Sequence, residues 1–252
     1  MKNLLIYINP LKKFQPHHNM MIEVQIDNSL DYWKPEDIVV ATNFPYEYHG
    51  IKSIEVPDLI NSQYPEDPRA IINSKTDVII YLLENKIITE LTWFHDTDAF
   101  QLAPFVEDEY TEFKLEKDLG LVKYGIYPER NLNKVDVPDS ERINSGNIFF
   151  KPEALDIFKR VLEKMDTERI LDESAFSLMM PEIKDRVQIM NQTYNIGARY
   201  IHKNLDISEY PIRVVHFPPQ KPQWYGKVKF LLTPRLIKLI DEKLINLSKS
   251  QS

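Results

Sequence analysis

LTWFHDTD, residues 91–98, is the stretch from which the rest of this sequence is most readily interpreted. Its first five residues have the aromatic and β-branched composition of a strand, and Asp96 and Asp98 follow directly. Charges delivered into a loop by an apolar strand need a partner, because an unpaired buried carboxylate is unfavourable. Two carboxylates at this spacing can both reach a hard divalent cation that also binds phosphate oxygens. The stretch predicts a metal site at a strand's carboxyl end; the alternative is a helix N-cap with a solvated neighbour.

Strand and helix patterns alternate on both sides of this stretch. Strands are predicted at residues 4–8, 37–42, 51–56, 91–95, 119–124, 147–150 and 212–217. Helices are predicted at residues 68–84, from 152 onward and at 172–180, with a strand at 78–83 as the alternative within the first. This alternation favours an α/β fold with a mostly parallel sheet, in which ligands bind at the carboxyl ends of strands.

The composition limits the partners, the metal ligands and the location that we expect for this protein. The chain has 252 residues, of which 43% are hydrophobic, and a formal charge of −7 argues against broad attraction to nucleic acid. Because there is no cysteine, a metal has to be bound by oxygen or imidazole ligands. No stretch approaches the ~20 apolar residues of a membrane span, so we expect a cytoplasmic protein.

The last part of the chain has helical periodicity. Apolar and basic residues alternate over residues 233–248 in the pattern of an amphipathic helix. We expect one domain over residues 1–232, followed by this helix and a tail over residues 233–252. The helix either packs on the domain or binds a membrane surface or a partner.

Three further segments carry residues suited to binding a polar ligand. Asn144-Ser145-Gly146-Asn147 precedes an apolar run and is interpreted as a turn that forms a pocket wall, with an ordinary Asn-Gly turn as the alternative. Asp172 and Glu173 open a helix, where an acid is either a cap or a ligand for a sugar hydroxyl.

The third segment begins at the end of a late strand. His216 offers an imidazole ligand, Lys221 a cation for a diphosphate and Trp224 an aromatic surface for a sugar or base, all within one proline-rich loop. His95 is adjacent to the two acids, but the alternation of a strand directs it to the opposite side from Asp96.

In this order, the segments resemble glycosyltransferases of the GT-A fold, especially the retaining glycogenin and lipopolysaccharide galactosyltransferase-like group. The resemblance spans residues 4–225 and rests on residues 93–98, 144–150, 172–173 and 216–224. The sequence departs from the family pattern at Glu173, where the family has glutamine. The last segment also has an extra residue before Trp224, and two prolines where the family usually has glycine.

The resemblance implies a role for each candidate residue. Asp98 and His216 would hold Mn²⁺ or Mg²⁺, Asp96 would contact the metal or the ribose, and Lys221 would neutralise the leaving diphosphate. Asp172 would bind the sugar or act near its anomeric carbon. The remaining donor-binding residues implied by the resemblance are Ile8, Asn9, Thr97, Asn144, Ser145, Gly146, Glu173 and Trp224.

The implied activity is transfer of a hexosyl group, with retention of configuration, from a nucleoside diphosphate sugar, of which a UDP-sugar is the first expectation. The acceptor would be a saccharide, a lipid-linked molecule or another hydroxyl compound. The alternatives are a viral-type glucosyltransferase acting on a hydroxymethylated DNA base and a catalytically silent relative that binds a nucleotide or glycan. A phosphatase of the haloacid dehalogenase type also uses two spaced acids, but its acids normally follow the first strand.

Overall fold

The computed structural model describes residues 1–58, 68–105, 113–123, 137–138, 141–198 and 211–245. Within these ranges, no helix is long and apolar enough to cross a membrane.

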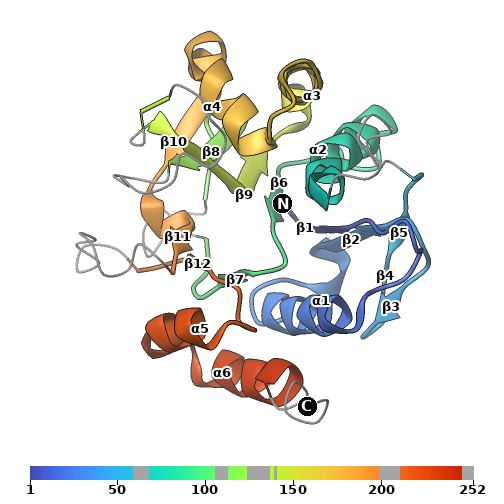
Figure 1. Ribbon diagram of the computed structural model, residues 1–252, viewed down its shortest axis with the longest axis vertical. Coiled ribbons are helices and arrows are strands. Elements are labelled where there is room, and N and C mark those ends of the chain that lie inside the picture. Colours follow the sequence, from blue (N-terminus) through green and yellow to red (C-terminus); the bar gives the residue numbers. More distant parts are fainter. Residues whose placement is uncertain (59–67, 106–112, 124–136, 139–140, 199–210, 246–252) are drawn as a thin grey trace.

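A seven-stranded sheet forms the centre of the molecule, with the strand order β10-β8-β9-β6-β1-β2-β5 (Figure 1). Its strands are β1 (Lys2–Tyr7), β2 (Ile38–Thr42), β5 (Ile54–Glu55), β6 (Thr92–His95), β8 (Leu119–Lys123), β9 (Ile143–Phe150) and β10 (Val187–Met190). Neighbouring strands are parallel except at β9, which is antiparallel to both β6 and β8. The prediction of an α/β fold with a mostly parallel sheet is confirmed.

Helices cover both faces of this sheet (Figure 1). The α-helices that flank it are α1 (Pro16–Ser29), α2 (Pro68–Glu84), α3 (Leu155–Glu168) and α4 (Asp172–Ile183). Short 3₁₀ helices lie at Pro35–Asp37, Pro152–Ala154, Lys184–Arg186, Gln192–Tyr194 and Lys229–Leu231. The first helix packs on one face, and the other three pack together on the opposite face.

Adjacent residues of the central strands are buried on opposite faces, since side chains alternate along a strand. Leu4 packs in the same cluster as residues of α2, α3 and α4, whereas Leu5 packs against Ile22 of α1. Phe149 and Phe150 likewise belong to different clusters. Burial on both faces explains why the predicted strands are continuous apolar runs.

A small second sheet adjoins the central one. It contains β11 (Ile196–Gly197), β12 (Val214–His216) and β7 (Ala99–Gln101), with β12 in the middle. β12 is antiparallel to β7, so that His216 pairs with Ala99. This pairing brings the predicted late histidine beside the Asp-Thr-Asp segment. A separate hairpin consists of β3 (Glu47–Tyr48) and β4 (Ile51–Lys52).

The C-terminal segment packs on α1. It contains α5 (Pro222–Val228), α6 (Pro234–Ile240) and a π-helical turn at Asp241–Ile245. Leu236 and Ile240 are buried in a cluster that includes Met21 of α1. The prediction of an amphipathic helix is confirmed up to residue 245, and its packing on the domain is the arrangement observed. Residues 246–252 lie outside the described ranges, and the division at residue 232 stays a prediction.

Two predicted elements differ from the structure. Residues 51–56 were predicted as one strand but form two, because the chain leaves the hairpin at Ser53, whose NH donates to the Tyr46 carbonyl at 2.8 Å. Residues 144–147 were predicted as a turn but lie inside β9. Val122 pairs with Asn144 while the preceding Leu121 pairs with Ile148, so an irregularity in the ladder accommodates this polar, glycine-containing segment within the strand.

Candidate metal and donor site

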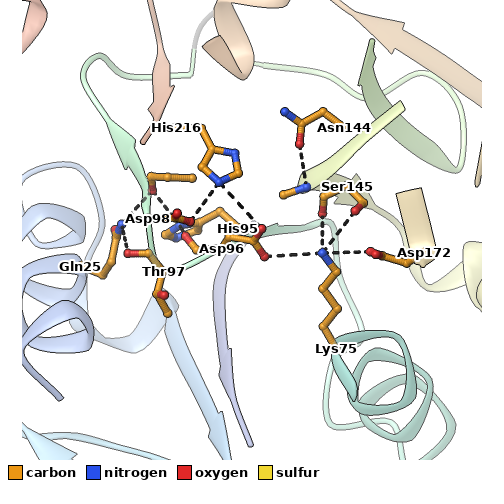
Figure 2. Close-up of polar contacts among 12 residues, drawn as sticks. Gln25, Lys75, His95, Asp96, Thr97, Asp98, Asn144, Ser145, Asp172 and His216 are labelled. Atoms are coloured by element: carbon orange, nitrogen blue, oxygen red, sulfur yellow. Dashed lines mark hydrogen bonds and ion pairs between the residues drawn. The ribbon is translucent and has the colours of Figure 1, made fainter. Parts of the chain in front are cut away.

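Asp96, Asp98 and His216 converge where the two sheets meet (Figure 2). β6 ends at His95, and the chain turns immediately, with the Ala99 NH donating to the Asp96 carbonyl at 3.0 Å. His216 Nε2 lies 2.9 Å from Asp98 Oδ1 and 3.9 Å from Asp96 Oδ2. One ligand atom from each residue falls within 4.8 Å of the other two. The geometry therefore gathers all three predicted metal ligands.

The charges of this group depend on one another. Burial lowers the pKa of His216, but Asp98 and then Asp96 outweigh it and raise the value to about 9. Burial raises the pKa of Asp98, but the charge and hydrogen bond of His216 hold it below its usual range. For Asp96, burial dominates, and the pKa is raised despite Lys75 and His216. The imidazolium thus balances negative charge that a divalent cation would also balance.

Gly146 lies directly against this group. A Cβ at this position would come within 2.4 Å of His216 Cε1 and 2.8 Å of Asp96 Oδ2. The Gly146 carbonyl also accepts from the Asp96 NH at 2.9 Å. Glycine therefore permits β9 to approach the carboxylates and imidazole closely. Two carboxylates and an imidazole around such a space fit the donor set that Mn²⁺ or Mg²⁺ would require.

Lys75 of α2 links this group to Asp172 at the start of α4 (Figure 2). Its Nζ lies 2.9 Å from Asp172 Oδ2 and 3.5 Å from Asp96 Oδ1. It also donates to the carbonyl and hydroxyl oxygens of Ser145, at 3.2 and 3.3 Å. Burial lowers the pKa of Lys75, but Asp172 and Asp96 outweigh it and raise the value, which keeps the ammonium charged.

The sequence analysis did not identify Lys75, although a signal is present. The residue is three positions before Val78 and seven before Leu82, both of which are buried on the face of α2 toward the sheet. A lysine in register with an apolar stripe is directed inward, and a buried ammonium requires carboxylate partners.

Asp172 is buried, with 3% of its side chain exposed, and it occupies the first position of α4 after the N-cap residue Leu171. The alternative that Asp172 is only a cap is wrong, because its carboxylate pairs with Lys75. Glu173 is half-buried, and its charge contributes to the raised pKa of Lys75. Asn144 Oδ1 accepts from the Gly146 NH at 3.0 Å, so Asn144 shapes the segment of β9 beside the acids.

Ile8 and Asn9 follow the end of β1, and their side chains make contacts within the protein. Ile8 is a core residue with 2% exposure. Asn9 donates to the Lys13 carbonyl at 2.7 Å and accepts from the Leu11 NH at 2.9 Å, while its own NH donates to Asn43 at 2.9 Å. The side chain of Asn9 therefore fixes the conformation of its own loop.

Lys221 and Trp224 lie at the start of α5. Lys221 is exposed. Trp224 is half-buried against the cluster beneath α5 and α6, and the Lys227 ammonium lies 4.7 Å from the centre of its ring. Phe217 connects this segment to the acids, since its NH donates to the Asp98 carbonyl at 2.9 Å.

His95 contacts the backbone of the turn that carries Asp96 and Asp98. It is buried, and its Nδ1 lies 3.2 Å from the Asp96 carbonyl and 3.0 Å from the Ala99 carbonyl. Burial lowers the pKa of His95 to about 3, so the ring is neutral. Its Nδ1 faces these two carbonyl oxygens, and its Nε2 lies 2.8 Å from Asn3 Oδ1. The prediction that His95 is directed away from the ligand group is confirmed.

This architecture is that of the GT-A glycosyltransferases. No protein-family model matches the chain, and no curated protein matches it in sequence. Among solved structures, the galactosyltransferase LgtC in complex with donor and acceptor sugar analogues is similar, with a TM-score of 0.60 and 16% identity over 96% of both chains.

Two further solved structures have the same fold. A glycosyltransferase involved in glycosylation of the major capsid of PBCV-1 has a TM-score of 0.52 and 12% identity over 92% of this chain and 99% of its own. Mouse xyloside xylosyltransferase 1 has a TM-score of 0.50 and 13% identity over 85% of this chain and 96% of its own. At these identities the likeness establishes the fold.

Proposed function

We propose that this protein is a divalent-metal-dependent glycosyltransferase that moves a hexosyl group from a nucleoside diphosphate sugar to an acceptor hydroxyl. A UDP-sugar is the proposed donor, and the proposed acceptor is a saccharide, a lipid-linked molecule or another hydroxyl compound. Retention of the anomeric configuration is carried over from the resemblance to the glycogenin group. The proposed location is the cytoplasm.

The observation that carries the proposal is the joint placement of Asp96, Asp98 and His216 at the carboxyl end of β6. Their ligand atoms lie within 4.8 Å of one another, and Gly146, which has no side chain, lets β9 lie directly against them. In open α/β sheets, ligands bind outside the carboxyl ends of strands. Lys75 and Asp172 border the same space from the opposite wall.

The residues of this site divide between two tasks. A bound Mn²⁺ or Mg²⁺ would neutralise the diphosphate oxygens on which charge develops as the glycosidic bond breaks. Asp96, Asp98 and His216 would hold that ion. Asp172 is fixed by Lys75 and would bind a sugar hydroxyl or stabilise positive charge near the anomeric carbon. The exposed Lys221 would add a second positive charge to the leaving diphosphate.

A thermal-shift screen against nucleoside diphosphates and their sugars, with and without Mn²⁺, tests this proposal. Ligand binding to the folded state raises the unfolding temperature, and we expect a metal-dependent increase for one donor. Asp98→Ala should lose this increase. If no nucleotide shifts the wild-type protein, the proposed donor class is wrong.

The same preparation separates the alternatives. Donor binding without transfer or slow donor hydrolysis would identify a catalytically silent relative. A DNA acceptor requires duplex binding, which a gel-shift experiment at low salt detects. With a formal charge of −7, we expect no such binding.

A further inference from the structure

The turn that carries Asp96 and Asp98 is held in place through its carbonyl groups. Each of the four carbonyls from Asp96 to Ala99 has a donor within the protein. The Asp96 carbonyl accepts from the Ala99 NH, and the Asp98 carbonyl accepts from the Phe217 NH. The carbonyls of Thr97 and Ala99 both accept from the side chain of Gln25, at 2.9 and 3.0 Å.

Gln25 reaches this turn from α1, outside the two sheets (Figure 2). It lies in the middle of α1, its side chain is fully buried, and Thr97 is 72 residues further along the chain. A primary amide has two hydrogens, and both are used here, one on each carbonyl. His95 adds a second donor to the Ala99 carbonyl.

These contacts bear on metal binding because the two carboxylates repel each other. Asp96 and Asp98 stand two residues apart on the same turn, and their like charges favour conformations that separate the two carboxylates. Lys75 and His216 offset only part of this repulsion. A divalent ion needs its ligands at defined distances, and residues behind the ligands orient them. Two hydrogen bonds from a rigid helix oppose that separation before any ion arrives.

We propose that Gln25 is a positioning residue for metal binding, which acts by fixing the backbone of the turn that presents Asp96 and Asp98. This inference rests on the proposed metal-dependent function. Gln25 donates its hydrogen bonds to the carbonyls of Thr97 and Ala99 and is not among the three candidate metal ligands.

Asn28 supplies a matched control on the same helix. It is buried like Gln25 and also makes two hydrogen bonds to the backbone of β7. Its amide donates to the Gln101 carbonyl at 3.0 Å, and its oxygen accepts from the Gln101 NH at 3.0 Å. These contacts lie beyond the turn, so Asn28→Leu should loosen the same helix and strand without releasing the carboxylates.

The experiment measures the binding of Mn²⁺ alone to the wild-type protein, Gln25→Met and Asn28→Leu, with free Mn²⁺ followed by electron paramagnetic resonance. We expect Gln25→Met to bind Mn²⁺ about 10-fold more weakly or worse, and Asn28→Leu to stay within about twofold of wild type. Thermal unfolding of both variants establishes that they are folded. If Gln25→Met does not fold, Gln25→Asn keeps the amide but falls short of the carbonyls and should weaken binding in the same direction.

The outcomes separate this inference from the function on which it rests. Wild-type binding with an unchanged Gln25→Met overturns the positioning role and leaves the metal site intact. Equal weakening in both variants also overturns it, because general loosening of α1 would then explain the effect. Absence of Mn²⁺ binding in the wild-type protein overturns the metal site and the positioning role together.

Discussion

Two ion pairs of equal length flank Asp96, and they differ in exposure. The Lys75–Asp172 pair has an N–O distance of 2.9 Å, with 9% and 3% of the side chains exposed. The His216–Asp98 pair also has a distance of 2.9 Å, with 19% and 30% exposed. Asp96 lies between them, 3.5 Å from Lys75 and 3.9 Å from His216.

This difference in exposure indicates that the Lys75–Asp172 pair is permanent, whereas the partners in the His216–Asp98 pair can be exchanged. In a buried pair, each charge depends on its protein partner for stabilisation, because water cannot replace a lost partner. In the more exposed pair, solvent can replace either group, and an incoming cation can take the place of the imidazolium. The site thus combines a fixed, buried pair of Lys75 and Asp172 with a more accessible pair of His216 and Asp98.

The largest predicted effect comes from breaking the buried pair. Lys75→Met leaves Asp172 buried without its cation and should lower the free energy of unfolding by about 3–5 kcal/mol in a urea titration. His216→Ala should lower it by about 1 kcal/mol or less in the same assay, since solvent reaches that pair.

A double variant sharpens this test. Adding Asp172→Leu to Lys75→Met removes the stranded charge and should restore at least about 1 kcal/mol. If Lys75→Met and His216→Ala are equally destabilising, the distinction between a permanent and an exchangeable pair is wrong.

A smaller effect is expected from filling the space beside the exposed pair. In Gly146→Ala the new methyl group meets the His216 ring and the Asp96 carboxylate, which should destabilise the fold by about 1–3 kcal/mol and displace the ligands. We therefore expect loss of the Mn²⁺-dependent thermal shift. Gly226→Ala is the control, because nothing lies within 4 Å of its Cβ position. Within a helix this change should stabilise by up to about 1 kcal/mol, and metal binding that survives Gly146→Ala would contradict the placement of β9.

The smallest effect concerns Asp77, two residues from Lys75 on α2. Burial and then the charge of Asp166 raise its pKa to about 7. At this position the folded state therefore binds a proton that the unfolded state releases near pH 4, so the contribution of Asp77 to stability falls as pH rises from about 4 to about 7. Asp77→Asn should remove this slope and stabilise the protein by about 1 kcal/mol at pH 8, a value reduced because the side chain is partly exposed. Urea titrations at pH 5 and pH 8 measure it, and an unchanged slope would contradict the assignment.

Much of the site could be predicted because short stretches of sequence determine where its residues lie on the strands. An apolar strand delivers Asp96 and Asp98 to its carboxyl end, and a second strand ends at His216. Each pattern is local, and parallel sheets place such ends on one edge. The family resemblance then indicated which distant ends meet, and the pairing of β7 with β12 confirms that placement.

The parts that were missed depend on contacts distant in sequence. Lys75 on α2 and Asp172 on α4 are separated in sequence by β6, β7, β8, β9 and α3, and no local pattern pairs them. The segment at 144–147 has turn residues, but Asn144 pairs with β8 and Asn147 with β6, so the sheet overrides the local preference. Gln25 lies in a helix whose interior polar residues give no indication that they bind a turn elsewhere in the chain.

The pairing of His216 with Asp98 spans 118 residues, which has a consequence for synthesis on the ribosome. At typical elongation rates of about 5–20 residues per second, roughly 6 to 24 s separate the appearance of the carboxylates from that of the imidazole. During this interval β7 has no β12 beside it, and both acids lack their late partner. The first parallel strands and α1 are therefore synthesised well before His216, and the proposed metal site is complete only once the last part of the fold is added.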